Sequence, residues 1–522
     1  MYILRSKTER NITTVINNHK SLFKLANTML NVSFTVNDTK ILTYCFLGLI
    51  LTRGSIFSDG LATDDYTFGK TEFFNQTIIQ LISQGRIFTI PILWLFELVN
   101  VNITYIYIPF CLIILFLQAL LITSIFRFTL ISNYKYSEWG ALLSILHPYH
   151  TEILTFKSAT IIYCVCVFLL IFCLEYFICY DSTYFLILTI LLFIGITIYQ
   201  ILINYILTIL FLLVLVYTTR VNNDKSILQV KRRMIGLAAA GGVAIMLSGL
   251  TSAVLPRVLG IAPEGRAQLI SAGDVTARIH DVVKLVLKVY VLDEPIISRP
   301  VKLLLLVILL ISVYLISKNI LNTRQWTTCF GFLGLIALYI LFTPGIIVIV
   351  GAWWPVPRVI NHSSFVYGAL VIIGLHNVKQ IIISRIVIII VIVVSVAFGL
   401  ANAQILMDQL QINRWDAMQS NRLVARLELL PLFTNAKYLY IDGGKWKYNQ
   451  HLRTINGDMN ISAFYPVYSK IALINHISGY NFLPANSIKI EIGHHYCLSV
   501  APWPASDSVT IITDLGIVCL EN

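Results

Sequence analysis

Long apolar runs separated by short polar stretches fill the chain up to residue 404. A helix that crosses a bilayer needs about 20 mostly apolar residues, within a range of about 17–25. Eleven segments fit this pattern, although the third and the fifth are short or polar. The eleven predicted spans are 40–57, 103–126, 136–152, 158–179, 183–198, 200–219, 234–255, 301–318, 326–346, 363–377 and 383–404.

One further apolar segment, 86–99, is too short to span a bilayer. Its length favours an interfacial or re-entrant helix. Pro91 lies near its start, which suits the first turn of a helix because no backbone N–H is needed there.

The composition supports a polytopic membrane protein of mostly α structure. The chain is 57% hydrophobic and 12% charged, whereas soluble proteins are about 45–50% apolar and about 25% charged. This excludes the soluble-enzyme, disordered and disulfide-rich secreted classes for most of the chain. Of nine cysteines, only Cys497 and Cys519 lie outside the apolar part. These two either pair in an oxidising compartment or remain buried free thiols.

The distribution of Lys and Arg predicts the orientation. If residues 1–39 are cytoplasmic, the internal loops carry eleven Lys/Arg and one acidic residue, Asp224. This obeys the positive-inside rule and places the C-terminus outside. The net charge of +12 is therefore explained by topology rather than by nucleic-acid binding. The internal loops are 127–135, 219–233, 318–324 and 376–385.

The character of the sequence changes after the last predicted span. The residues that follow show apolar positions at helical spacing, which predicts a helix continuing from that span. Segment 437–442 is typical of a strand, and 508–520 of a hairpin across Asp514–Gly516. We therefore expect a small α/β domain outside the membrane. The predicted regions are a cytoplasmic tail (1–39), a transmembrane catalytic domain (40–404, with outer loops 58–102, 255–300 and 347–362) and the outer domain (405–522).

Two adjacent carboxylates, Asp64 and Asp65, follow the first span. Neighbouring residues point apart, so one of them can face a reaction while the other caps a helix N-terminus. A desolvated carboxylate at a membrane surface would suit proton abstraction from a hydroxyl. The alternative is a solvated loop with a helix cap.

Four charged residues are predicted at the outer membrane edge. Arg86 either binds a phosphate or carboxylate through its fork geometry or extends to lipid headgroups. Glu152 and Lys157 lie where ionisable residues are costly unless they are paired or functional. Arg358 follows two prolines in a stiff segment that suits a fixed contact to a lipid phosphate.

Other polar residues in the apolar part favour structural roles. His147 and His150 could bind a metal with Glu152, but their spacing differs from the helical H-E-x-x-H pattern and an aromatic-belt loop is the plainer account. Gln200 and Asn204 share a helix face, which favours hydrogen bonds between helices. We expect no metal site.

In this order, the motifs resemble the phage-type serotype-converting glucosyltransferases that modify O-antigen. The likeness covers nearly the whole chain. It departs at Lys157, where the family typically has Arg followed soon by Asp. The matching segments are 63–65 (TDD), 84–86 (QGR), 148–157 (PYHTEILTFK), 198–204 (IYQILIN), 357–358 (PR), 408–422, 502–509 (PWPASDSV) and 517–518 (IV).

The resemblance implies a C-type glycosyltransferase (GT-C) fold in the bacterial inner membrane, with the C-terminal domain in the periplasm. It implies a polyprenyl-phosphate-linked sugar, most simply glucose, as donor and O-antigen of lipopolysaccharide as acceptor. The family places a catalytic carboxylate in the first outer loop. Asp64 or Asp65 would then be the general base of a metal-independent, inverting displacement that needs no cofactor.

The leaving polyprenyl phosphate needs cationic partners. The residues expected to bind the donor phosphate are Arg86, Glu152, Lys157 and Arg358. Second choices on the long outer loop are Arg257, Arg266, Arg278 and Arg299.

Two other classes remain open from the sequence. A transporter or flippase of lipid-linked sugars is disfavoured by scarce mid-span charges and by the lack of an inverted repeat. A related transferase of another group, such as another hexose or an acyl group, is the other class. A His deep in a span would suggest acyl transfer, and the predicted spans contain none deep inside. The C-terminal domain either grips the acceptor polymer, through Trp446, Tyr448 or Tyr465, or supports the outer loops.

Overall fold

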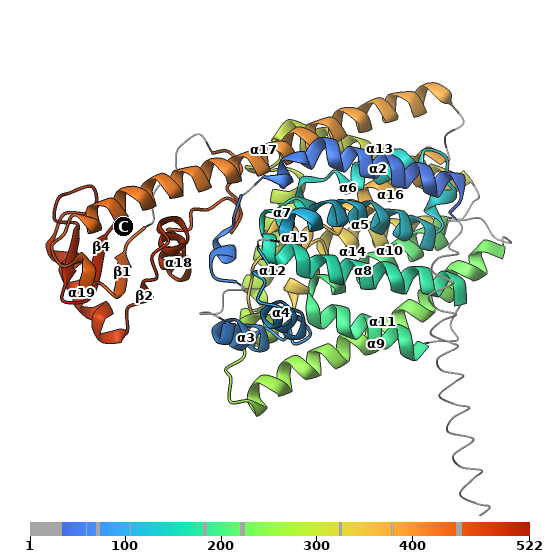
Figure 1. The fold of residues 1–522 in the computed structure, drawn as a ribbon. Helices are drawn as coiled ribbons and strands as arrows, with labels where there is room; N and C mark the ends of the chain where they lie inside the picture. Colours follow the sequence, from blue (N-terminus) through green and yellow to red (C-terminus); the bar gives the residue numbers. More distant parts are fainter. Residues whose placement is uncertain are drawn as a thin grey trace, which may run out of the picture.

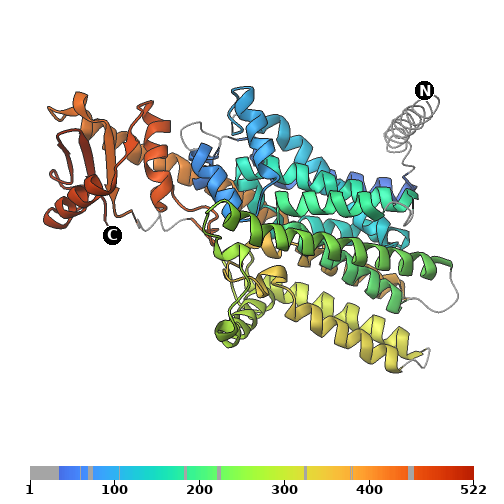
Figure 2. The same cartoon turned by 90° about the horizontal axis from the view of Figure 1, so that it is seen from below.

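The chain forms a helical bundle from which one long helix leads to a small sheet (Figures 1 and 2). This arrangement is seen in a computed structural model. The residues that it describes are 34–58, 60–68, 74–104, 106–180, 185–219, 225–322, 326–376, 378, 380–444 and 452–521.

Within these residues, eight helical segments are long and apolar enough to cross a membrane. They coincide with eight of the eleven predicted spans. Their helices are α2 (Val36–Arg53), α5 (Tyr107–Phe128), α8 (Lys157–Tyr180), α10 (Ile201–Thr219), α11 (Lys225–Val258), α13 (Arg299–Asn322), α15 with α16 (Pro357–Ile360, Ser363–His376) and α17 (Ile381–Glu428).

The third predicted span, 136–152, is wrong as a single helix. Helix α6 ends at Ile145, and a 3-10 turn, η5 (Pro148–His150), follows. Pro148 has no backbone N–H and disfavours helical geometry in the residue before it, so the helix stops there. The remaining helices of the bundle are α3 (Phe74–Ser83), α4 (Thr89–Leu98), α6 (Ser137–Ile145), α7 (Glu152–Thr155), α9 (Phe185–Ile198), α12 (Val275–Tyr290) and α14 (Trp326–Leu341).

Three of these short helices bear on the sequence predictions. Helices α9 and α14 correspond to the predicted spans 183–198 and 326–346. Both are apolar, but their 14 and 16 residues fall short of the about 17 that a span needs. The short apolar helix predicted within 86–99 is α4, with Pro91 in its first turn.

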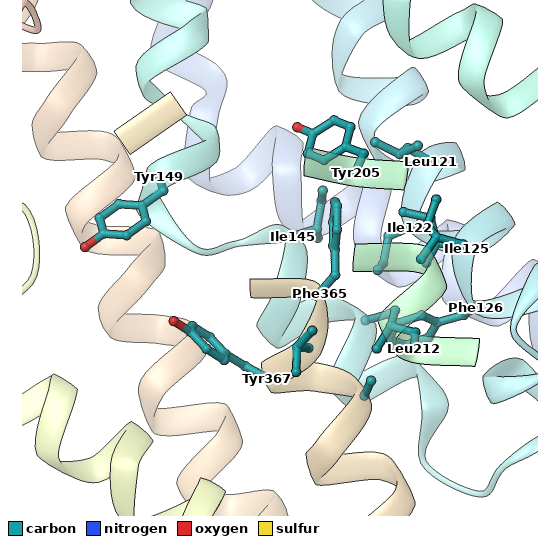
Figure 3. Close-up of a cluster of buried hydrophobic side chains, with 14 of the residues drawn as sticks. Leu121, Ile122, Ile125, Phe126, Ile145, Tyr149, Tyr205, Leu212, Phe365 and Tyr367 are labelled. Atoms are coloured by element: carbon teal, nitrogen blue, oxygen red, sulfur yellow. The ribbon is translucent and has the colours of Figure 1, made fainter. Parts of the chain in front are cut away.

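The core of the bundle lies where α5, α10 and α16 meet. Figure 3 shows Ile122 and Phe126 of α5 facing Leu212 of α10 and Phe365 of α16, all fully buried. Lipid tails are as apolar as these side chains, so van der Waals packing holds such helices together.

Helices α6 and α16 pack closely because each presents a glycine to the other. A Cβ atom on Gly368 would lie 2.1 Å from the carbonyl oxygen of Gly140, and one on Gly140 would lie 2.6 Å from that of Gly368. Small residues allow this approach of two backbones, as is common between membrane helices.

We expect Gly368→Ala to lower the stability of the protein by about 1–3 kcal/mol, because backbone atoms have to move apart. Gly242→Ala on α11 is the matched control. The described residues leave open space around that glycine, so alanine should be neutral or stabilising there by up to about 1 kcal/mol. Thermal unfolding in detergent measures both variants. A Gly368→Ala midpoint at or above that of the wild type would contradict this packing.

The two ends of the bundle differ. At one end, the start of α2 meets the loop after α5, where Asn37 donates to the Ser132 carbonyl oxygen, and Tyr134 stacks on His376 at the end of α16. The other end carries α3, α4 and α12, and α17 projects from it towards the sheet (Figure 1). We call this second end the sheet end.

Helix α17 is a single helix of 48 residues, as the helical spacing predicted. Its last turns pack through Leu423 and Leu427 against Leu439 and Phe464 of the sheet region. The four strands follow the order β2-β1-β4-β3, with β1 parallel to both neighbours and β3 antiparallel to β4. The elements of this region are β1 (Tyr438–Asp442), α18 (Val467–Ser478), β2 (Leu483–Pro484), α19 (Ser487–Ser499), β3 (Val509–Ile512) and β4 (Leu515–Cys519).

This region confirms the predicted strand within 437–442 and the predicted hairpin. Cys497 of α19 and Cys519 of β4 form a disulfide, with 5.2 Å between their Cα atoms, which decides between the two alternatives for this pair. Trp446 and Tyr448 lie outside the described residues.

Candidate active site

The two aspartates lie on a 3-10 turn, η2 (Thr63–Tyr66), at the sheet end of the bundle. Helix α17 holds Leu61, which precedes this turn by two residues, in place. The Asn413 side chain accepts from the Leu61 backbone N–H at 2.6 Å and donates to the Leu61 carbonyl oxygen at 2.8 Å. One amide thus pairs both backbone groups of Leu61.

Asp65 is buried and caps the start of α8. Its carboxylate accepts from the backbone N–H groups of Lys157 (3.0 Å) and Ser158 (2.9 Å) and from the Ser158 hydroxyl (2.7 Å). It also accepts from the Ala62 backbone N–H at 2.9 Å. Burial raises the pKa of Asp65, and these hydrogen bonds act in the opposite direction. The lone pairs of Asp65 are thereby used in holding η2 on the bundle.

Asp64 is half-buried and faces the sheet region. It accepts from the Tyr468 hydroxyl at 2.5 Å and from the Thr63 hydroxyl at 3.3 Å. No other hydrogen bond to the Asp64 carboxylate occurs in the part of the chain that the structure describes, so this carboxylate keeps lone pairs for a ligand. One aspartate caps a helix and the other faces outward, which is the arrangement that their adjacency allowed.

Arg358 lies buried at the start of α15, behind Asp64. Its guanidinium pairs with Glu152, its backbone N–H donates to Glu152 at 2.5 Å, and Asp458 lies 3.4 Å away on the outer side. Its guanidinium also lies 4.4 Å from the centre of the Trp354 ring. Burial raises the pKa of Glu152 to about 7, although the charge of Arg358 opposes this. Glu152 therefore positions Arg358, because Arg358 occupies both of its carboxylate oxygens.

Lys157 lies at the first turn of α8 and is buried. Its ammonium sits 4.9 Å from the centre of the Tyr107 ring. The residue thus lies beside the Asp65 cap, inside the bundle.

An apolar cavity of about 220 Å³ opens between α10 and α11 at the same end of the bundle. Arg86 and Arg266 line it together with Tyr199 and Trp354. Arg86 stacks on Tyr199 at 5.0 Å and Arg266 on Trp354 at 3.9 Å. Its apolar lining includes Ile201, Ile203, Ile245, Ile346, Ile347, Leu269 and Val350.

The cavity is short of negative charge. The Nε of Arg86 is buried with no hydrogen-bond partner among the described residues. Burial lowers the pKa of Arg86; Tyr199 opposes this, and the nearby Arg266 and Arg358 lower the pKa further. Glu264 pairs with Arg266 at 3.3 Å, but both side chains are partly exposed. Arg86 and Arg266 are the only charged side chains among the described residues that line the cavity, and this favours an anionic ligand.

The backbone around the cavity explains two of the sequence motifs. Gly85 has φ +75°, and a Cβ there would lie 2.1 Å from the Ser252 hydroxyl oxygen on α11, so glycine is needed to turn Arg86 inward. Gln200 donates to the Gln84 carbonyl oxygen at 2.8 Å, and Asn204 to that of Val359 at 2.9 Å. The Asn204 bond joins α10 to α15 and confirms the expected hydrogen bond between helices, whereas Gln200 binds the loop after α3.

His147 and His150 both lie buried inside the bundle. His150 Nε2 lies 2.8 Å from the Ser364 hydroxyl, and His147 packs on the Tyr149 ring. No group of three His, Cys, Asp or Glu side chains arranged to hold a metal occurs among the described residues.

The family model for Glucosyl transferase GtrII matches residues 56–375. The chain belongs to this family. The match confirms the resemblance to glucosyltransferases, and with the apolar helices it makes the protein a membrane glucosyltransferase. No curated protein and no solved structure matches the chain.

The GtrII match contains every predicted site residue, from Asp64 to Arg358. It ends before α17 and the sheet. Sequence reasoning missed Tyr468 and Asp458, which lie beyond the match and reach the site only through the fold. Arg266 was predicted only as a second choice. The structure singles it out because it lines the same cavity as Arg86, which follows the turn at Gly85.

Proposed function

We propose that this GtrII-family protein transfers glucose from a polyprenyl-phosphate-linked donor to the O-antigen of lipopolysaccharide. The reaction would take place at the periplasmic face of the bacterial inner membrane, by metal-independent displacement with inversion. The sheet end would face the periplasm, and residues 1–39 would lie in the cytoplasm.

Charge and cysteine chemistry support this orientation. At the helix ends away from the sheet (Figure 1), Arg127 lies in the last turn of α5, and Arg233 and Arg385 lie near the starts of α11 and α17. The positive-inside rule assigns such basic ends to the cytoplasm. The Cys497–Cys519 disulfide lies in the sheet region, and disulfides persist in oxidising compartments such as the periplasm.

The observation that carries the proposal is the apolar cavity lined by two arginines at the sheet end of the bundle, the end where η2 carries Asp64 and Asp65. A lipid phosphate joins an anionic group to an apolar chain, and the cavity offers Arg86 and Arg266 next to isoleucines of α10 and α11. Trp354 connects the cavity with Arg358, because its ring centre lies 3.9 Å from the Arg266 guanidinium and 4.4 Å from that of Arg358.

In the proposed reaction, Asp64 takes the proton of the acceptor hydroxyl, and the hydroxyl oxygen attacks the anomeric carbon of the donor. The bond from that carbon to the phosphate oxygen breaks, and polyprenyl phosphate leaves with the electron pair. Arg86 and Arg266 stabilise its charge. Arg358, whose charge Glu152 and Asp458 neutralise, has a structural role between Asp64 and the phosphate site. Lys157 supports the Asp65 cap from inside the bundle.

We expect Arg86→Gln and Arg266→Gln each to raise KM for the lipid-linked donor about tenfold or more, because each removes a charged hydrogen-bond donor to the phosphate. Arg257→Gln is the control, since Arg257 is exposed at the end of α11 and outside the cavity. Steady-state glucosyl transfer in proteoliposomes measures all three. Equal KM values in the three variants would contradict the donor site.

The same proteoliposomes test the transporter alternative. Wild-type protein that moves lipid-linked glucose across the bilayer without transferring it to acceptor would replace the proposed function.

A further inference from the structure

The turn that carries Asp64 is held from two sides. Asp65 points into the bundle, where it caps α8. Tyr66 is 3% exposed and belongs to the core of the sheet region, where its ring lies 5.4 Å from that of His476. Asp64 stands between them and faces Tyr468 of α18.

Helix α18 is itself fixed to the sheet. The Ser469 hydroxyl donates to the Ala463 carbonyl oxygen at 2.7 Å, and the Lys470 ammonium donates to the Gly443 carbonyl oxygen after β1. Tyr468 therefore approaches Asp64 from a rigid element. Burial and the charge of Asp64 raise the pKa of the Tyr468 hydroxyl, so it stays protonated and donates.

We propose that Tyr468 is a positioning residue for Asp64, so that α18, which lies outside the family-matched residues 56–375, completes the active site. This inference rests on the proposed function of Asp64 as the base. The hydroxyl fixes the direction of the carboxylate. Among the described residues, the charge of Asp64 acts on Arg358 of α15, and the charge of Asp458, in the loop before α18, acts on the Tyr468 hydroxyl.

Tyr468→Phe removes the hydroxyl alone, and Tyr480→Phe is the matched control. The exposed Tyr480 hydroxyl donates to Glu428 at 2.7 Å, so this variant also loses one hydrogen bond to a carboxylate. For Tyr468→Phe we expect kcat to fall about 10- to 100-fold, as for loss of a hydrogen bond to a charged group, with donor KM unchanged. Unchanged kcat, in a variant with wild-type thermal stability, would overturn the inference.

A second readout does not depend on turnover. Carbodiimide labels protonated carboxyl groups, and mass spectrometry gives the labelling rate of Asp64. We expect Tyr468→Phe to raise this rate several-fold, roughly in line with one lost hydrogen bond, and Tyr480→Phe to leave it unchanged. If wild-type protein transfers no glucose, the proposed function fails, while faster labelling would still establish the Tyr468 contact. Equal labelling in both variants would refute the contact itself.

Discussion

Asp64→Asn is expected to lower the rate of glucosyl transfer about 10²–10⁴-fold, the usual contribution of a general base. Asparagine is nearly isosteric and still accepts the Tyr468 hydrogen bond, so the fold and the donor KM should be retained. Transfer of labelled glucose in proteoliposomes gives kcat and KM separately.

Asp65→Asn is the matched comparison, and we expect it to lower the stability of the protein rather than to remove a catalytic group. The amide would turn an NH₂ donor towards N–H and O–H donors of Ala62, Lys157 and Ser158, which leaves buried groups unpaired. We expect a lower unfolding temperature and less folded protein. A stable Asp65→Asn protein without activity, beside an active Asp64→Asn protein, would exchange the two roles.

Glu152→Ala is expected to destabilise the protein by about 3–5 kcal/mol, because it leaves the guanidinium of Arg358 buried without its main counter-charge. Asp458→Ala removes the other carboxylate of the same arginine. The Asp458 side chain is 40% exposed, whereas that of Glu152 is fully buried. The loss for Asp458→Ala should therefore be about 0–1 kcal/mol.

Thermal unfolding and the yield of monodisperse protein measure both variants. Equal destabilisation by the two substitutions would show that Glu152 is not the residue that holds Arg358 in place.

The sequence predicted most of the bundle because a lipid-facing helix has to be apolar along its length. The third span was predicted too long: it ran to residue 152, whereas α6 ends at Ile145, shortly before Pro148. The strand and the hairpin of the C-terminal region were also predictable, because short runs of β-branched and aromatic residues adjoin turn residues, Gly443–Gly444 after β1 and Asp514 in the hairpin.

The site was predicted only in part. Adjacency showed that Asp64 and Asp65 point apart, but the choice between them depends on α8, whose first N–H groups bind Asp65. The partner of Asp64, Tyr468, is 404 residues away along the chain. No local spacing can reveal a contact of that kind, because the packing of α18 on η2 creates it.

The donor set shows the same limit. Arg86, Glu152, Lys157 and Arg358 were grouped because all lie at the outer edge of apolar segments. The structure separates them: Arg86 lines the cavity, Glu152 neutralises Arg358, and Lys157 lies beside the Asp65 cap. Arg266 joins Arg86 because the long outer loop folds back over α11.

The most direct test of the central claim is glucose transfer by purified wild-type protein in proteoliposomes that contain lipopolysaccharide. Polyprenyl-phosphate-linked glucose and a nucleotide-linked glucose are supplied in separate reactions, with Asp64→Asn run in parallel. The account predicts labelled polysaccharide only from the lipid-linked donor, and a rate about 10²–10⁴-fold lower in the variant. Equal labelling from the nucleotide-linked donor, or full activity in Asp64→Asn, would contradict it.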